Sequence, residues 1–143
     1  MQKEYGVYIF SDDKELISID KVCELLANSY WASNRKRETM IKSIENSICI
    51  GIYLQGEMVG FSRIVTDYAT MYWLCDVIID ANHQKRGLGK KLVEIITEMS
   101  ELDGSFGILA TRDAHKLYEK YGFYSVGEKY MRKDAEKQEG RVK

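Results

Sequence analysis

Residues 84–89 read Gln-Lys-Arg-Gly-Leu-Gly and lie between an apolar run, Met71 to Ile79, and an amphipathic run, Leu88 to Leu102. An apolar strand, a basic turn with glycines and then a helix place unpaired backbone N–H groups at a helix N-terminus, where the helix dipole favours an anion. Gly87 and Gly89 lack the Cβ atoms that would keep a ligand away from the backbone. The stretch therefore predicts a site for a phosphorylated ligand.

The composition is typical of one globular domain, with 143 residues, 45% hydrophobic residues and a net charge of −1. A charge this close to zero gives no field that would attract nucleic acid or a membrane surface. No apolar run in the sequence reaches the roughly 18–20 residues of a membrane span. We expect a single domain over 1–133 and a charged, disordered tail over 134–143.

The three cysteines, Cys23, Cys49 and Cys75, are far apart, and each lies within an apolar pattern. Because the first ten residues also lack the apolar core of a secretory signal, these are expected to be buried thiols of a cytoplasmic protein. No CxxC pair occurs, and His83 and His115 are the only histidines, so the sequence predicts no metal site.

Hydrophobic periodicity predicts the order β-α-α-β-β-β-α-β-α-β-β, an α/β fold. An antiparallel meander followed by a β-α-β crossover gives a mixed, mostly antiparallel sheet of six or seven strands with helices on both faces. The predicted strands cover residues 5–10, 48–54, 58–67, 70–79, 106–111, 123–126 and 129–132. The predicted helices cover residues 21–29, the inner stripe Met40, Ile41 and Ile44, 88–102 and 113–121.

Local signals set the predicted ends of these elements. Asp20 is the expected N-cap of the first helix, and Ser33 or Asn34 that of the second. Gly122 is the expected left-handed C-cap of the last helix. The phosphate-binding turn follows the strand over 70–79, and the carboxyl ends of strands are where open α/β sheets bind ligands.

A second motif lies about thirty residues beyond the turn, where residues 117–123 read Leu-Tyr-Glu-Lys-Tyr-Gly-Phe. QxxGxG followed by LYxxxGF, with the predicted strands and helices around both, resembles the GCN5-related N-acetyltransferases (GNAT superfamily) over about residues 7–132. The resemblance implies that the phosphorylated ligand is acetyl-CoA, used as a cosubstrate. In the family the strand before the turn splays from the next strand, and the thioester enters the gap.

By this resemblance, N–H groups of the turn hold the pyrophosphate and the preceding strand end pairs with the pantetheine amides. The residues implied to bind acetyl-CoA are Val77, Ile78, Ile79, Gln84, Lys85, Arg86, Gly87, Leu88, Gly89, Lys90 and Thr111. The three basic residues in this set either screen the adenosine 3′-phosphate or simply form a solvated helix start. Many members carry asparagine where Thr111 stands, so its contact with the pantetheine arm departs from the family pattern.

Tyr118 matches the general acid that protonates the leaving CoA thiolate in the family. A phenol with a pKa of about 10 and a thiol with a pKa of about 8.5 form only a modestly mismatched donor–acceptor pair, so the chemistry is reasonable. The alternative is that Tyr118 is an aromatic side chain that only packs its short helix against the core.

Asp76 is a carboxylate inside the apolar run 71–79, where a buried charge needs a partner. One interpretation is a general base or acceptor anchor, because an amine with a pKa of about 10.4 is only about 0.04% neutral at pH 7. The other is a structural ion pair with Arg63. If the chain turns at residues 68–69, Arg63 faces Leu74 and lies diagonally across from Asp76. Because side chains along a strand alternate between its two faces, Cys75 is expected to point away from Asp76. This argues against an acetyl-cysteine intermediate.

The break between the first two predicted helices contains Tyr30, Trp31 and Arg35. Aromatic rings beside an arginine suit a small substrate with a carboxylate or phosphate, and the alternative is a core tryptophan with a surface arginine. We therefore expect an N-acetyltransferase that moves acetyl from acetyl-CoA to a primary amine of a small molecule or protein by direct attack. The alternative is a silent acyl-CoA-binding sensor. The acceptor, the range of acyl groups and the choice between monomer and homodimer stay open.

Overall fold

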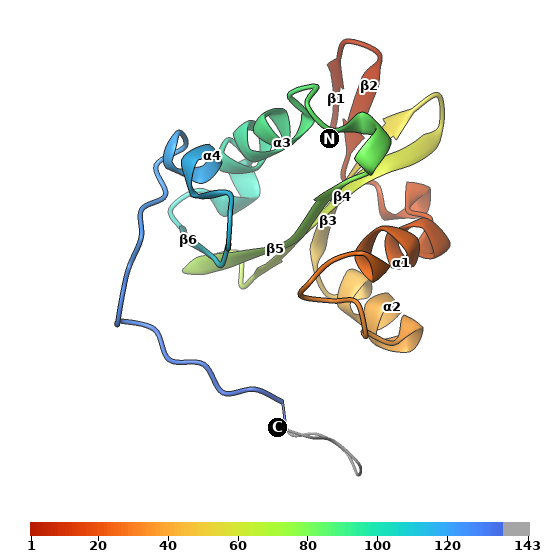
Figure 1. The fold of residues 1–143 in the computed structure, drawn as a ribbon. Coiled ribbons are helices and arrows are strands. Elements are labelled where there is room, and N and C mark those ends of the chain that lie inside the picture. Colours follow the sequence, from red (N-terminus) through yellow and green to blue (C-terminus); the bar gives the residue numbers. More distant parts are fainter. Residues whose placement is uncertain (136–143) are drawn as a thin grey trace.

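The computed structural model describes residues 1–135, which form one six-stranded sheet whose strands lie side by side in sequence order (Figure 1). Neighbouring strands are antiparallel except β5 and β6, which are parallel and joined by a crossover through α3. The strands are β1 (Gln2–Tyr5), β2 (Tyr8–Ser11), β3 (Ile48–Leu54), β4 (Glu57–Thr66), β5 (Met71–Ile79) and β6 (Phe106–Leu109). The α-helices are α1 (Ile19–Ala27), α2 (Arg37–Glu45), α3 (Leu88–Thr97) and α4 (His115–Glu119), and the 3-10 turns are η1 (Lys14–Leu16), η2 (Ala81–His83) and η3 (Ser100–Leu102).

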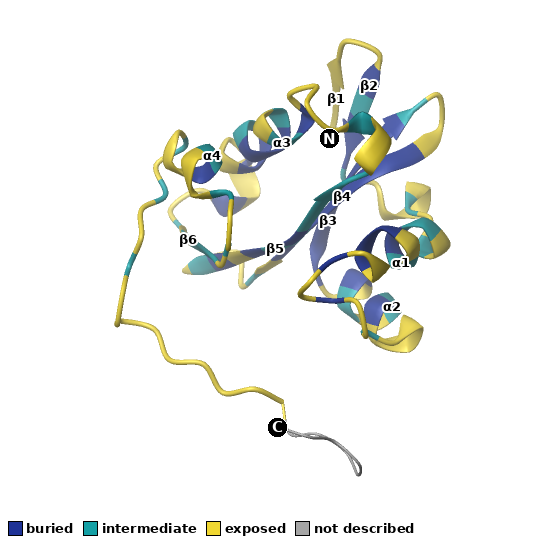
Figure 2. Cartoon of the chain, viewed as in Figure 1, coloured by how far each residue is buried: buried dark blue, intermediate teal, exposed yellow. Residues whose placement is uncertain are grey.

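Helices cover both faces of the sheet, so the central strands are buried on both sides (Figure 2). One core contains Leu92 and Ile96 of α3, and the other contains Leu26 of α1 and Met40 of α2. Six of the seven residues of β3 are buried, which explains its continuous apolar sequence. The predicted mixed, mostly antiparallel sheet between helices is therefore confirmed.

The N-terminal strand differs from its predicted bounds. Instead of one strand over 5–10, the chain forms the hairpin β1–β2, with Tyr5 paired to Tyr8 across the turn. Gly6 has a φ of 60°, a conformation that glycine adopts without steric cost. All four residues of β1 are exposed, so this strand carries no apolar alternation from which it could have been read.

The helix starts also differ from the predictions. Ser18, not Asp20, caps α1, because its Oγ accepts a hydrogen bond from a first-turn N–H group at 3.1 Å. α2 begins after residue 36 without a side-chain cap, rather than directly after Ser33 or Asn34. The residues between the two helices form a turn that carries polar side chains to the sheet. Further on, the predicted helix over 88–102 is divided into α3 and η3.

The final hairpin predicted over 123–126 and 129–132 is wrong within the described residues. A hairpin needs a ladder, but after α4 the chain runs past β6 and then away from the sheet (Figure 1). The exposed fractions of Tyr124 and Met131 are 80% and 98%. β6 is consequently an edge strand of the described sheet. Most of the predicted tail, residues 136–143, lies outside the described residues.

Candidate active site

A β-bulge interrupts β5 in the middle of the sheet. Cys75 pairs with Arg63 and Ile78 pairs with Phe61, so Asp76 and Val77 together face the single residue Ser62 of β4. Asp76 has a φ of 53°, in the left-handed region, which suits aspartate better than most residues. The bulge shifts the alternation of side chains between the two faces of the sheet.

Beyond the bulge, β5 loses its other neighbour. The parallel ladder between β5 and β6 runs from Met71 and Phe106 to Leu74 and Leu109 and ends there. In the described sheet, the carboxyl half of β5 therefore has only β4 beside it. Backbone groups on that edge, over residues 75–79, are placed to pair with an extended ligand instead of a strand.

The predicted phosphate-binding turn follows directly. Gly87 is the N-cap of α3 and has a φ of 78°, while Lys85 has a φ of 63°. Leu88 anchors the helix start in the core, whereas residues 84–87 are exposed. A Cβ on Gly87 would lie 2.8 Å from the hydroxyl oxygen of Tyr5. Glycine is therefore needed here for two reasons, its backbone conformation and the contact with β1.

Strand β2 supports the same turn from beneath. The Tyr8 hydroxyl accepts a hydrogen bond from Nη1 of Arg86 at 2.8 Å and lies 3.0 Å from Nδ1 of His83. Arg86, one of the three bases implied to screen a phosphate, is thus held by the protein itself. Lys85 and Lys90 are exposed. No pattern in the sequence predicts that the N-terminal hairpin supports this turn.

Asp76 is buried, and three side chains donate hydrogen bonds to it. Its Oδ1 accepts a hydrogen bond from Nε1 of Trp31 at 2.9 Å. Its Oδ2 accepts from Nη1 of Arg35 at 2.6 Å and from Nε of Arg63 at 2.9 Å. Arg63 also donates from Nη1 to Ser47 Oγ at 3.2 Å. Burial raises the pKa of Asp76, but the hydrogen bonds and charges of the two arginines outweigh it and hold that pKa below its ordinary value.

This arrangement contains the predicted ion pair between Asp76 and Arg63, although the predicted register was wrong by one residue. Arg63 faces Cys75 rather than Leu74 because the register is already offset by one residue at the turn between β4 and β5, where Thr66 pairs with Tyr72. The bulge at Asp76 then interrupts the alternation of side chains, so Cys75 does not point away from the Asp76 cluster. The charges of Arg63, Asp76 and Arg35 all act on its thiol, and burial, the largest effect, raises its pKa to about 11. Cys75 is therefore a neutral thiol near the site.

The loop between α1 and α2 forms one wall of this region. Trp31 is 41% exposed, so the interpretation of Trp31 as a core tryptophan is wrong. Its ring meets Tyr30 edge to face, with centroids 5.0 Å apart. Arg112 lies in the loop after β6. Its guanidinium is 3.8 Å from the centroid of the Tyr30 ring. Arg112 is not among the site residues predicted from the sequence, although it directly follows Thr111.

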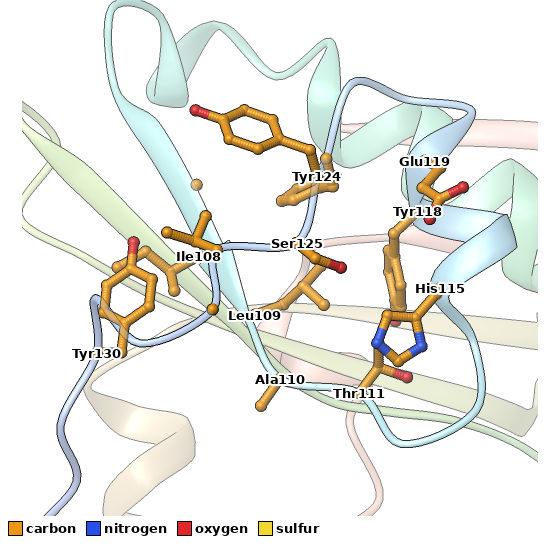
Figure 3. Close-up of a pocket in the computed structure, with 14 residues that line it drawn as sticks. Ile108, Leu109, Ala110, Thr111, His115, Tyr118, Glu119, Tyr124, Ser125 and Tyr130 are labelled. Carbon is orange, nitrogen blue, oxygen red and sulfur yellow. The ribbon is translucent and has the colours of Figure 1, made fainter.

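Tyr118 is buried on α4 and lines a cavity of about 340 Å³ between β6, α4 and residues 123–130 (Figure 3). Thr111 and His115 line the same cavity. The Thr111 hydroxyl accepts a hydrogen bond from the N–H of Ala114 at 3.0 Å and so closes the turn before α4. Burial, followed by the nearby Tyr30 and Asp113, raises the pKa of Tyr118. The phenol is protonated at neutral pH.

The end of α4 fixes this tyrosine, as the Gly122 signal predicted. Gly122 has a φ of 91° and donates its N–H to the carbonyl of Glu119, while the N–H of Phe123 donates to the carbonyl of Tyr118. The Tyr118 and Phe123 rings meet with centroids 5.8 Å apart. These are the two hydrogen bonds and the apolar contact of a Schellman C-cap.

A sequence model described as "Acetyltransferase (GNAT) domain" matches residues 45–125, which is more than half of the chain. The chain belongs to the GNAT family. A GNAT member of known structure, assigned as an acetyltransferase from Xanthomonas campestris pv. campestris, is 30% identical. It superposes with a TM-score of 0.87, covering 92% of this chain and 96% of that one.

The curated relatives that this GNAT chain matches are named after different acceptors. A spermine/spermidine N(1)-acetyltransferase of Bacillus subtilis is 28% identical over 92 residues, which cover 55% of this chain and 60% of that protein. A histone acetyltransferase of Glycine max is 28% identical over 107 residues, which cover 73% of this chain and 44% of that protein. The chain thus spans about half the length of these relatives. No helix among residues 1–135 is long and apolar enough to cross a membrane.

Proposed function

We propose that this GNAT chain transfers the acetyl group of acetyl-CoA to a primary amine by direct attack in a ternary complex. The observation that carries the proposal is the place where β5 parts from β6. The phosphate-binding turn lies at the end of β5, and the α4 helix that carries Tyr118 follows β6 in the chain. In this proposal the groups that bind acetyl-CoA follow β5, and the group that donates the proton follows β6. The two strands lie on either side of the place where they separate.

For the donor, N–H groups of Gln84 to Gly89 bind the pyrophosphate, with Lys85 and Lys90 as additional charges. The left-handed conformations at Lys85 and Gly87 and the ten-residue helix α3 support this assignment. The unpaired edge of Val77, Ile78 and Ile79 binds the pantetheine arm, which acts as an extended strand.

For the transfer, the amine nitrogen forms a bond to the thioester carbonyl carbon, and the C–S bond then breaks. The departing thiolate takes a proton from the phenol of Tyr118, the amine releases its proton to solvent, and the Tyr118 phenolate regains a proton from solvent. Cys75 does not act as a nucleophile in this scheme, because a thiol with a pKa near 11 is neutral at pH 7.

Asp76 serves in this proposal as a positioning residue rather than as the general base. Its two oxygens already accept three hydrogen bonds, and its lowered pKa makes it a weak proton acceptor. It holds Trp31, Arg35 and Arg63 at the wall of the acceptor site.

Release of the CoA thiol with a panel of amines tests the proposal. Tyr118→Phe should lower kcat by at least about tenfold with little change in acetyl-CoA affinity, a typical loss for a general acid. Tyr121→Phe is the matched control, because Tyr121 lies close to Tyr118 in the chain and is half-buried. Binding of acetyl-CoA without turnover of any amine would instead favour a silent sensor.

A further inference from the structure

The acceptor wall holds more positive than negative charge. The two guanidiniums of Arg35 and Arg63 share the single carboxylate of Asp76. An arginine carries five N–H donors. Arg35 uses one of these on Asp76, and Arg63 uses one on Asp76 and one on Ser47. Their side chains are 21% and 13% exposed, so each is partly accessible.

We propose that the acetyl acceptor is an amine that also carries an anionic group, a carboxylate or a phosphate, which Arg35 and Arg63 bind. This inference rests on the proposed acetyltransferase function and names the class of its acceptor. Planar guanidinium forks recognise both anions by paired hydrogen bonds. The buried Asp76 fixes both arginines before a ligand arrives, which reduces the entropy lost on binding.

Arg35 and Arg63 are called the clamp below. The surroundings of the clamp also carry a net positive charge. Arg112 lies over Tyr30, next to Trp31, and so brings a third guanidinium to the loop that carries Arg35. Asp113 is the nearby acid and acts on Tyr118. Three guanidiniums against two carboxylates leave a net positive wall, which favours an anionic ligand and disfavours a polycation.

The anionic group of the acceptor binds at the arginines and places its amine at the acceptor wall. This contrasts with the relative named for spermine and spermidine, whose acceptors are polyamines.

The test compares acceptors that differ only in this group: an α-amino acid against its amide, phosphoethanolamine against ethanolamine, and spermidine as a polycation. In at least one pair, the anionic member should show a kcat/KM about tenfold to a hundredfold higher than its neutral partner, as expected for a charge-assisted contact. Whether the gain occurs with the amino acid or with phosphoethanolamine identifies the anion. Equal use of both members of each pair, or a preference for spermidine, would overturn the inference.

Substitution of Arg35 tests whether the preference for an anionic acceptor comes from the clamp. Arg35→Gln should bring the ratio between the anionic and neutral members close to one, because it lowers kcat/KM of the anionic member far more than that of the neutral member. A purely structural role would lower both members equally and leave the ratio unchanged, which would contradict the inference. Arg37→Gln is the matched control, because Arg37 lies two residues away but pairs with the exposed Asp20.

If acetyl-CoA binds but no amine is acetylated, the proposed enzyme fails, and the clamp is still tested by calorimetry. The same pairs are titrated into the CoA complex, and wild-type protein should bind the anionic member about tenfold more tightly. Equal affinities within each pair would overturn the clamp independently of catalysis. Retention of the folded circular-dichroism spectrum by Arg35→Gln separates loss of the clamp from loss of the fold.

Discussion

Replacing Asp76 by asparagine should destabilise the protein strongly, because the carboxylate is the centre of a buried ionic cluster. Its Oδ2 receives N–H groups from two guanidiniums, and its Oδ1 receives the indole N–H. The amide of asparagine keeps one acceptor oxygen but replaces the other with an NH₂ group. That NH₂ group is itself a donor and cannot accept the N–H groups that the lost oxygen accepted. At least two charge-assisted hydrogen bonds are thus lost or weakened, at about 1.5–3 kcal/mol each.

We therefore expect Asp76→Asn to lose about 3–5 kcal/mol of unfolding free energy at pH 7, the range for breaking a buried ion pair from one side. For a protein of this size that loss lowers Tm by roughly 10 °C. Urea unfolding followed by tryptophan fluorescence measures it. Asp20→Asn is the control: Asp20 also pairs with an arginine, but at the surface, where a pair contributes only about 0–1 kcal/mol.

The pH dependence gives a second measurement of the same effect. The folded pKa of Asp76 lies below its unfolded value, so its stabilisation is fully present above the unfolded pKa of about 3.9. This stabilisation disappears as the pH falls through the folded pKa. The difference between wild type and Asp76→Asn should accordingly be constant from pH 7 to about pH 5 and shrink below about pH 4.

A contrary result would be equally informative. If Asp76→Asn lost turnover together with the rising limb of the pH–rate profile, while its unfolding free energy fell by less than about 1 kcal/mol, the carboxylate would be a general base and the positioning role would be wrong.

Three other substitutions test separate parts of the site. Gly87→Ala should lower stability by about 1–2 kcal/mol, because alanine resists a φ of 78° and its Cβ meets Tyr5, and it should weaken acetyl-CoA binding in calorimetry. Unchanged affinity would argue against pyrophosphate binding at this turn. Gly122→Ala should cost about 1 kcal/mol, measured by differential scanning calorimetry, because it strains the C-cap that fixes Tyr118 although nothing lies within 4 Å of the new Cβ. Cys75→Ala should retain turnover within about threefold, and mass spectrometry of wild type mixed with acetyl-CoA should show no acetylated protein. An acetyl adduct on Cys75 would replace direct attack by a covalent route.

Much of the fold could be predicted from local signals in the sequence. The glycines of the turn and Gly122 each require a left-handed backbone that few other residues accept, so their positions were readable without tertiary information. The apolar sequence of β3 likewise reflects burial between helices. The hairpin turn at Gln55 and Gly56, both with positive φ, was predicted for the same local reason.

Features that depend on distant partners could not be read in this way. The bulge at Asp76 leaves no mark in the sequence, yet it interrupts the alternation of side chains and leaves Cys75 on the same face as Asp76. The exposed strand β1 has no apolar pattern, and its importance comes from Tyr5 beneath Gly87. The two strands predicted after α4 have suitable residues, but strand formation also requires a neighbouring ladder.

The contact between the N-terminal hairpin and the turn has a practical consequence for dissecting this protein into fragments. A fragment that begins at β3 still contains the helix start, the split strands and Tyr118, and by chain order it resembles a self-sufficient catalytic core. It lacks Tyr8, however, so the Arg86 guanidinium and the His83 ring lose the phenol between them. It also lacks Tyr5, against which Gly87 packs. We therefore expect the smallest fragment that keeps this turn supported to begin at β1, because Tyr8 in the N-terminal hairpin contacts Arg86 and His83, more than seventy positions away.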